Sequence, residues 1–391
     1  MNNVEICAAK MERKNILWLT SWYPNKEDLF DGDFIQRHAR AAAIENNITV
    51  VFVKPSMLYN EIVHQGCEGV DEIIIYFPMA KGRLKQVQVL FRWRKAFLHA
   101  VESYIKAKGL PHLVHVHIPW KAGLIALYLN KRYDLSFIVT EHWGIYNDYV
   151  KDNFDQRWGI IQRLTKKICR ESLALISVSG YLGRAMQERG LTKSFSVIPN
   201  VVDNRVFYFL ERSKGPVFTF VHVSNMEDLK NVAGIINAFH ILLQSGARSA
   251  RLVLVGKYTE TLQQQAASLD LLESGIFFKG EISYADVAKE MQTGDCFVMN
   301  SHIENAPCVI SEALCCGIPV VATNVGGVPE MIDGSNGLLL PPDNTLLLAE
   351  AMERMIENQD FYHRKEIAAT ACLRYGLVAV ARQFQILYFN A

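Results

Sequence analysis

The chain has 391 residues, half of them hydrophobic, which is too many for one ordinary core and enough for two domains. Its formal net charge is +1, because 41 Lys and Arg residues nearly balance 40 Asp and Glu residues, and this excludes an overall positive field that would collect nucleic acid. The eight cysteines form no Cys-x-x-Cys pair, so we expect neither a zinc site nor a disulfide framework, and a reducing compartment is favoured.

The N-terminal 24 residues contain an apolar stretch that is too short for a secretory signal and is interrupted by charge. No other stretch reaches the length of a membrane span. We therefore expect a cytoplasmic protein.

Short apolar runs alternate with longer amphipathic segments, a pattern that predicts parallel sheets with helical crossovers. In the first half, the expected strands are residues 16–20, 48–53, 73–77, 113–116, 137–140, 175–178 and 196–198. The clearest helical patterns between them are residues 33–45, 93–106 and 121–131.

Residues 204–216 carry charges, Gly and Pro and are typical of a linker. Beyond it the alternation restarts, with expected strands at residues 219–223, 252–255, 276–279, 296–300, 319–323 and 337–340. The fold predicted is α/β, with two doubly wound, Rossmann-like domains whose parallel sheets face each other across a cleft and bind ligand at the carboxyl ends of their strands.

We place the N-terminal domain, on the acceptor side, at residues 1–205 and the C-terminal domain, on the donor side, at residues 206–370. Residues 371–391 are predicted to form a helix that packs back on the N-terminal domain. Its stretch 375–388 is apolar at helical spacing.

The stretch from Glu304 to Thr323, ENAPCVISEALCCGIPVVAT, has a carboxylate on each side of a predicted helix start. Pro307 suits a first helical turn, and the free amides at such a terminus attract an anion. A phosphate there, with acceptors at Glu304 and Glu312 on either side, suits a nucleotide-sugar, which has hydroxyls at both ends of a diphosphate. The alternative is that Glu304 is a loop acid and Glu312 a surface residue of the helix.

Several motifs together carry a family resemblance. Glu304 and Glu312 have the spacing E-x7-E, followed by GIPVVATNVGGVPE at 317–330 and NGLLL at 336–340, and further matches are VIPN at 197–200 with Asp203, Val255-Gly256 and FKG at 278–280. This set resembles the retaining family 4 glycosyltransferases with the GT-B fold.

The resemblance implies roles on the donor side. Glu304 would contact hydroxyls of the donor sugar, Glu312 would bind the ribose, and Lys230 would bind the phosphates; the alternative for Lys230 is a solvated charge at a helix start. Asn225 stands where the family usually has an arginine, and it supplies neither charge nor a bidentate fork. The other residues expected at the donor are Gly280 and Ile282 near the base, and Asn305, Ala306 and Pro307 at the helix start.

In the N-terminal domain, His142 follows an expected strand in TEHWG and corresponds to a family histidine near the donor sugar, although lone histidines are often structural. Gly32 lies in a first loop that resembles the family's glycine-containing loop at the donor phosphates or the acceptor. Asp31-Gly32-Asp33 matches a metal-binding DxD by its letters, but it follows the first strand, so we expect no metal.

The resemblance implies a metal-independent transferase that retains the anomeric configuration, needs no cofactor beyond its nucleotide-sugar substrate (UDP-, GDP- or ADP-linked), and takes a glycan or lipid-linked acceptor in cell-surface polysaccharide or glycoconjugate synthesis. Alternatives are a degenerate, non-catalytic nucleotide-binding protein, which Asn225 favours, or a GT-B sugar phosphorylase or epimerase. Residues 81–95, KGRLKQVQVLFRWRK, hold six cations and no acid with apolar residues interleaved. They are expected either to contact an anionic membrane peripherally or to form a solvated basic face.

Overall fold

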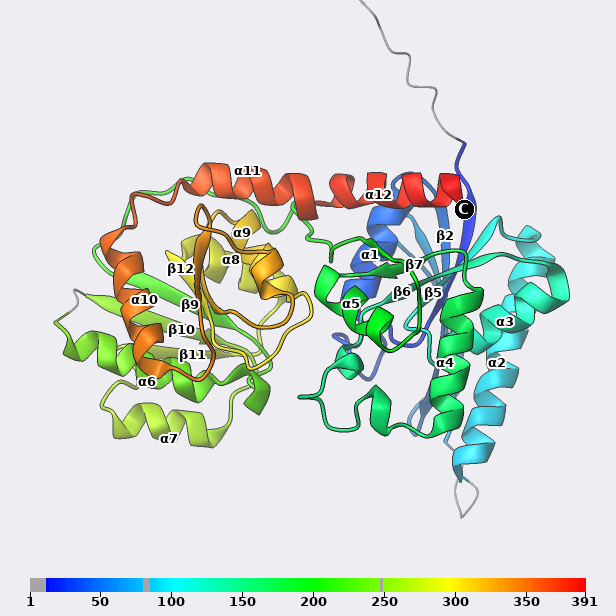
Figure 1. Cartoon of the computed structure of the whole chain (residues 1–391), viewed down its shortest axis with the longest axis horizontal. Coiled ribbons are helices and arrows are strands. Elements are labelled where there is room, and N and C mark those ends of the chain that lie inside the picture. Colours follow the sequence, from blue (N-terminus) through cyan, green and yellow to red (C-terminus); the bar gives the residue numbers. More distant parts are fainter. Residues whose placement is uncertain (1–11, 80–84, 247–248) are drawn as a thin grey trace, which may run out of the picture. The chain divides into compact units, whose positions relative to one another are not determined.

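The computed structural model describes residues 12–79, 85–246 and 249–391. The chain divides into two compact units. Unit 1 comprises Met1–Thr140, Ile168–Ala174 and Ala381–Ala391, and unit 2 comprises Glu141–Lys167 and Leu175–Val380. Each unit is an α/β structure built on its own strands (Figure 1). The domain boundaries at residues 205 and 370 stay a prediction.

Unit 1 holds strands in the order β3-β4-β2-β1-β5-β6. The chain extends from β1 in one direction to β2 and β4 and then in the other to β5 and β6, and β1 pairs in parallel with both β2 and β5. The strands are β1 (Asn15–Thr20), β2 (Asn47–Ser56), β3 (Ile62–Cys67), β4 (Val70–Pro78), β5 (Leu113–His117) and β6 (Phe137–Glu141). The helices between them are α1 (Asp33–Ala43), α2 (Lys85–Lys108) and α3 (Ala122–Tyr133).

Alternation along β1 separates the two faces of this sheet. Leu17 and Leu19 point to a core that they share with buried residues of α2 and α3, such as Phe97 and Ile125. Trp18 points to the opposite face, as the period of two requires.

The C-terminal helix α12 (Leu377–Asn390) supplies partners on that second face. The ring of Phe384 lies 5.9 Å from that of Trp18, centroid to centroid, and Asn46 donates a hydrogen bond to Gln385 at 2.8 Å. Unit 1 is therefore covered by helices on both faces.

Strand β3, which forms a hairpin with β4, is the one strand of this sheet that the sequence analysis missed. β3 pairs antiparallel with β4, so the sheet is parallel except at this edge. Most residues of β3 are exposed, and its sequence, IVHQGC, lacks the apolar run that marks the buried strands.

Unit 2 contains a six-stranded parallel sheet in the order β11-β10-β9-β12-β13-β14, with a large shared core. Its strands are β9 (Phe218–Val223), β10 (Ala250–Val255), β11 (Ile276–Gly280), β12 (Cys296–Met299), β13 (Val320–Thr323) and β14 (Gly337–Leu340). Its helices are α6 (Val232–Gln244), α7 (Glu260–Ser268), α8 (Tyr284–Thr293), α9 (Cys308–Cys315), α10 (Thr345–Glu357) and α11 (Arg364–Tyr375). α6 packs beside α7 and α10, and α9 beside α8 and α11 (Figure 1).

The chain between β6 and β9 completes the described elements. The two short strands β7 and β8 pair in parallel. These elements are α4 (Gly159–Glu171), β7 (Leu175–Ser177), α5 (Gly180–Glu188) and β8 (Ser196–Val197).

Every strand expected from the sequence is present, with ends that differ by up to three residues. Residues 204–216 contain no helix or strand, as predicted, but they lie within unit 2 rather than between the two units, and Phe207 is buried in the core of that unit. α2 begins eight residues before the predicted Trp93, while residues 81–84 of the predicted basic segment lie outside the described residues. In the part of the chain that the structure describes, the cysteines are free thiols and no helix is long and apolar enough to cross a bilayer.

Candidate functional site

The strand order of unit 2 marks a place for a ligand. From β9 the chain builds outwards through β10 and β11, and then returns to the other side of β9 with β12, β13 and β14. The direction of winding therefore reverses between β9 and β12, which are hydrogen-bonded neighbours. Ligands of open α/β sheets bind at such a switch point, outside the carboxyl ends of the strands.

Lys230 and Glu304 meet at this point. Lys230 ends a short 3-10 turn (Asp228–Lys230) after β9, and Glu304 lies in the loop after β12. Lys230 Nζ lies 2.5 Å from Glu304 Oε1, and Ser301 Oγ donates to the same oxygen at 2.8 Å. Oε2 of Glu304 accepts no hydrogen bond from the described residues, so it stays available to a ligand hydroxyl.

Two glycines hold the backbone of the Glu304 loop. Gly327 donates its amide hydrogen to the Glu304 carbonyl at 2.9 Å. A Cβ on Gly326 would come within 1.8 Å of the Glu304 carbonyl oxygen, and a Cβ on Gly327 within 1.8 Å of the Asn305 carbonyl oxygen. Only glycine allows this approach, so Gly326-Gly327 of the sequence motif has a structural reason.

Two hydrogen bonds tie the residues between Glu304 and α9 to earlier parts of the chain. Asn305 Nδ2 donates to the His142 carbonyl at 3.2 Å, and Asn200 Nδ2 donates to the Ala306 carbonyl at 2.8 Å. Pro307 is the N-cap of α9, and the first helical residue is Cys308. The helix therefore starts directly after residues 305–307, which were predicted to lie at its start. The first amides of α9 form the positive end of the helix, directly after the Glu304 loop in the chain.

Glu312 is buried inside α9. Tyr284, the first residue of α8, donates from its hydroxyl to Glu312 Oε1 at 3.1 Å. Glu312 is only 3% exposed, which excludes the alternative that it is a surface residue of the helix. A carboxylate buried to this degree requires hydrogen-bond partners, and Tyr284 is one of them.

Asn225 is exposed in the loop between β9 and Lys230, where its side-chain oxygen faces the amide of Glu227 at 3.5 Å. His222, near the end of β9, is buried. The Val298 carbonyl accepts from His222 Nδ1 at 2.8 Å, so Nε2 accepts from the Ser224 hydroxyl at 2.7 Å. Burial lowers the pKa of His222 to about 4, and Lys230 adds to the effect. His222 is therefore neutral and braces the loop.

Gly280 is the last residue of the outermost strand, β11, and Ile282 follows it at the same edge of the sheet. Gly280 has a left-handed backbone with φ +71° and accepts a hydrogen bond from the Gly256 amide at 2.9 Å. Ile282 is half-buried. Two strands separate them from β12, a spread that suits an extended ligand.

His142 belongs to unit 2 and is buried. The carboxylate of Glu141 accepts from the His142 and Trp143 amides at 2.8 and 2.9 Å and from the Tyr146 hydroxyl at 2.8 Å. Burial raises the pKa of Glu141 to about 7 even though these donors favour the ionised form. The turn that carries His142 is thus shaped by its neighbour, a role the sequence did not predict.

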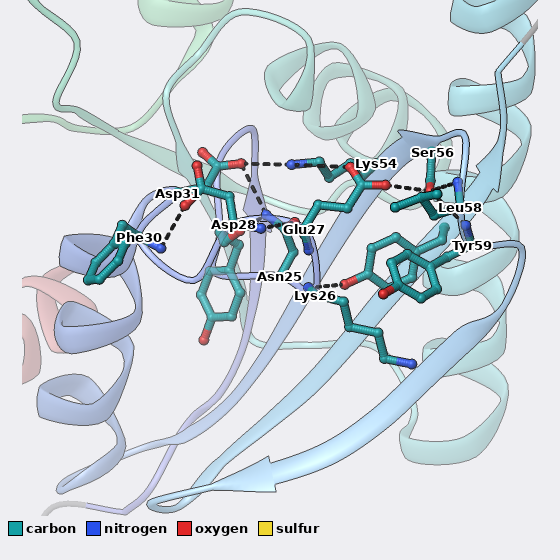
Figure 2. Close-up of polar contacts among 12 residues, drawn as sticks. Asn25, Lys26, Glu27, Asp28, Phe30, Asp31, Lys54, Ser56, Leu58 and Tyr59 are labelled. Carbon is teal, nitrogen blue, oxygen red and sulfur yellow. Dashed lines mark hydrogen bonds and ion pairs between the residues drawn. The ribbon is translucent and has the colours of Figure 1, made fainter. Parts of the chain in front are cut away.

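Gly32 lies in unit 1 and is described apart from these residues. It precedes α1 with φ +67°, and a Cβ there would come 2.8 Å from the Trp22 carbonyl carbon, so its position requires glycine. The preceding loop is tied by polar contacts, shown in Figure 2, in which Asp31 accepts from Asn25 at 3.2 Å and pairs with Lys54 at 3.4 Å. Asp33 pairs with Arg37 at 3.2 Å. Both aspartates of the Asp-Gly-Asp match therefore already have partners.

The sequence analysis did not identify three residues whose side chains hold these segments: Ser301, Tyr284 and Glu330. Ser301 and Tyr284 each follow a predicted strand, and this position at the carboxyl end of a strand could have indicated them. Glu330 accepts hydrogen bonds at the N-terminus of α5 from the amides of Gly180 and Tyr181 at 2.7 and 2.6 Å, and from Arg184 at 3.0 Å. No sequence signal joins these distant segments.

Two family models match adjoining parts of the chain. Residues 42–205 match Glycosyltransferase Family 4, and residues 207–371 match Glycosyl transferases group 1. Together they cover most of the sequence. The chain belongs to the family 4 glycosyltransferases.

Relatives of this glycosyltransferase support the assignment along its length. TuaC of Bacillus subtilis, named as a teichuronic acid biosynthesis glycosyltransferase, is 24% identical over 368 residues, which is 88% of this chain and 90% of TuaC. A glycogen synthase of Mycobacterium tuberculosis is 26% identical over 299 residues, which is 72% of this chain and 70% of that enzyme.

Solved structures show that the fold is GT-B. Sucrose-phosphate synthase from Thermosynechococcus elongatus superposes with a TM-score of 0.73 at 20% identity, covering 96% of this chain and 99% of that one. HepE from Anabaena, in complex with UDP, superposes with a TM-score of 0.72 at 18% identity, covering 96% of this chain and all of that one.

Proposed function

We propose that this glycosyltransferase moves a sugar from a nucleotide-diphosphate donor to a glycan or lipid-linked acceptor, with retention of anomeric configuration and without a metal. The observation that carries the proposal is the pair Lys230–Glu304 at the switch point of unit 2. It joins a cation for phosphate to a carboxylate with a free oxygen for sugar hydroxyls.

In this proposal, each part of the donor is bound by a particular group of the chain. The ammonium of Lys230 and the first amides of α9 would balance the charge that develops on the leaving diphosphate. Glu304 Oε2 would accept from hydroxyls of the donor sugar, and Glu312, held by Tyr284, would accept from the ribose. No residue is nominated as a nucleophile, because attack from the side of the leaving group needs positioning rather than a covalent intermediate.

His142, Asn225, Gly280 and Ile282 complete the proposed donor site, together with Asn305 to Pro307. Gly32 would approach the donor phosphates or the acceptor. Asn225 can donate one hydrogen bond to a phosphate, but without the charge of an arginine. Lys230 would therefore carry more of the leaving-group stabilisation than it does where an arginine is also present.

The names of related proteins bear on the identity of the donor and on the cellular setting. HepE has been solved with UDP, with UDP and glucose, and with UDP-glucose, while a Corynebacterium glutamicum relative is named as GDP-mannose-dependent. These names favour UDP and GDP over ADP as first candidates. The name of TuaC favours a role in cell-surface polysaccharide synthesis, which we place in the cytoplasm at the inner face of the membrane.

A test begins with thermal shifts against UDP, GDP, ADP and their sugar conjugates. We expect one nucleotide to raise the melting temperature of the wild-type chain and not that of Glu312→Ala. Turnover of the matching donor should fall in Glu304→Ala, and proton NMR of the product should show the donor's anomeric configuration. An inverted product would refute retention, and unchanged turnover in Glu304→Ala would refute the role of Glu304.

A non-catalytic, nucleotide-binding role is the second candidate, and the exposed Asn225 favours it. It predicts a thermal shift with a nucleotide but no turnover with any acceptor. Restoring the usual residue with Asn225→Arg would then be expected to leave the protein inactive, whereas in an active enzyme this change should tighten donor binding.

A further inference from the structure

One end of unit 1 exposes large apolar side chains from two separate parts of the chain. In the first two turns of α2 nearly every side chain is exposed, with Phe91 67% exposed. The turn that follows β2 is similar, with Leu58 78% exposed. The exposed apolar residues of this end are Met57, Leu58, Met79, Val87, Leu90 and Phe91, which we call the apolar end.

Hydrogen bonds bring these segments together. β2 and β4 finish side by side, with Ser56 paired to Pro78, and the Met79 amide donates to the Ser56 carbonyl at 3.0 Å. From α2, Arg92 Nη1 donates to the Pro78 carbonyl at 3.1 Å. These bonds place the ends of β2 and β4 beside α2, at the end of unit 1 where the exposed apolar residues lie.

The turn that carries Met57 and Leu58 is held in a fixed shape. The amides of Leu58 and Tyr59 donate to Ser56 Oγ at 2.9 and 2.8 Å, and that hydroxyl donates to Glu27 Oε1 at 2.5 Å, as Figure 2 shows. Fixing apolar side chains in water has no benefit for folding by itself, since burial is what stabilises them. Their arrangement suits a surface that is covered in function.

The α2 side of the apolar end carries cations. Lys85, Arg92, Arg94 and Lys95 are exposed on α2, and the helix has no acid before Glu102. Across a symmetric interface between two copies, these charges would face each other and repel. Against a membrane rich in anionic lipid, the same charges attract while the apolar side chains enter the interface.

We propose that the apolar end of unit 1 and the cations Lys85, Arg92, Arg94 and Lys95 form a surface that docks on an anionic lipid bilayer. Docking there would bring unit 1 to acceptors carried in the membrane. The inference deepens the proposed function only in this respect, by placing a lipid-linked acceptor within reach.

Sedimentation with lipid vesicles tests the surface directly, without donor or acceptor. Vesicles of phosphatidylcholine alone are compared with vesicles that also contain one quarter phosphatidylglycerol, at low and at high salt. We expect the full chain to bind only the anionic vesicles and to release them at high salt. No binding to anionic vesicles at low salt would overturn the proposal.

Paired variants separate the two contributions. Lys85→Gln with Lys95→Gln should weaken anionic vesicle binding by roughly 10- to 30-fold, since each cation near such a surface contributes about a fivefold gain. Val87→Asn with Phe91→Asn should weaken it by a similar factor. The controls, Lys193→Gln with Lys365→Gln and Leu373→Asn, change exposed residues of unit 2 and should bind as the wild type does.

Two further results would contradict the proposal. Equal losses in the controls would mean that binding is not specific to this surface. If Val87→Asn with Phe91→Asn instead converts a dimer to a monomer in analytical ultracentrifugation, with no vesicle binding by the wild type, the occupant is a second copy. Nucleotide-induced thermal shifts should be the same in every variant. A wild-type chain that shows the nucleotide shift but does not bind anionic vesicles therefore refutes the surface and leaves the proposed function standing.

Discussion

Lys230 Nζ and Glu304 Oε1 lie 2.5 Å apart, although 74 positions separate the two residues in sequence. The loops that carry them leave adjacent parallel strands, β9 and β12, at the same edge of the sheet. The sequence alone indicated each residue as a separate candidate. Their contact makes one unit of a phosphate-binding cation and a sugar-binding carboxylate.

Because the two residues act as a pair, their replacements should not be additive. We expect Lys230→Met and Glu304→Gln each to lower turnover about 100-fold, the size of effect seen when one group that stabilises developing charge is removed. The double variant should be little worse than either single one. Steady-state kinetics with the donor identified by thermal shift would measure this, with Lys365→Met as the surface control; a double variant as slow as the product of the two losses would show that the residues act independently.

Replacing Tyr284 should change nucleotide affinity more than turnover. Tyr284→Phe removes the hydroxyl that donates to Glu312 while keeping the ring, so the buried carboxylate loses a partner. We expect nucleotide affinity to fall roughly three- to tenfold, and turnover at saturating donor to change less. Calorimetric titration with the nucleotide would measure it. Tyr208→Phe, at an exposed tyrosine of unit 2, is the control, and equal affinity in both variants would remove Tyr284 from the site.

The sequence predicted most of the fold because buried strands and amphipathic helices leave periodic patterns. It predicted Glu304, Glu312 and the start of α9 because a short motif in one loop and one helix carries them. The hairpin strand β3 was missed because its exposed residues lack that pattern. The contacts of Tyr284 with Glu312 and of Glu330 with α5 were missed because they depend on packing between distant segments, which has no local signature.

A larger residue at position 327 should displace the Glu304 loop by steric overlap. Gly327→Ala would place Cβ 1.8 Å from the Asn305 carbonyl oxygen, so the Glu304 loop has to move. Because φ at Gly327 is −89°, backbone strain does not contribute. We expect a loss of about 1 to 3 kcal/mol in the free energy of unfolding, together with weaker donor binding.

Gly334→Ala is a matched control, because a Cβ at Gly334 would meet no atom within 4 Å and φ there is not positive. Urea unfolding and nucleotide titration of both variants make the comparison. Donor affinity retained in Gly327→Ala would mean that the backbone at Asn305 does not position the donor.

Glu330 predicts a loss of stability away from the proposed chemistry. Its carboxylate accepts from two amides at the N-terminus of α5 and from Arg184, so Glu330→Gln keeps the shape and removes the charge. We expect the free energy of unfolding to fall by about 1 to 2 kcal/mol. Urea unfolding would measure it against Glu357→Gln, an exposed acid at the end of α10, and equal stability in the two variants would show that the charge at α5 contributes nothing.

Glu141 predicts how stability depends on pH. Burial raises its pKa from the ordinary 4.5 to about 7, so between these values the folded chain holds a proton that the unfolded chain has lost. Stability contributed by this group is therefore complete below about pH 4.5 and is lost as the pH rises to 7, by about 3 kcal/mol in total. His222 acts with the opposite sign, since its lowered pKa makes stability rise between about pH 4 and 6.5.

The variant Glu141→Gln separates the effect of the Glu141 carboxyl on stability from the effect of His222. The amide keeps an oxygen for the His142 and Trp143 amides and cannot ionise. Urea unfolding at intervals from pH 4 to pH 8 should show wild-type stability falling relative to the variant by about 3 kcal/mol across this range. Parallel curves would mean that Glu141 ionises in the folded chain at its ordinary pKa. In that case the three hydrogen bonds from His142, Trp143 and Tyr146 stabilise the carboxylate enough to offset its burial.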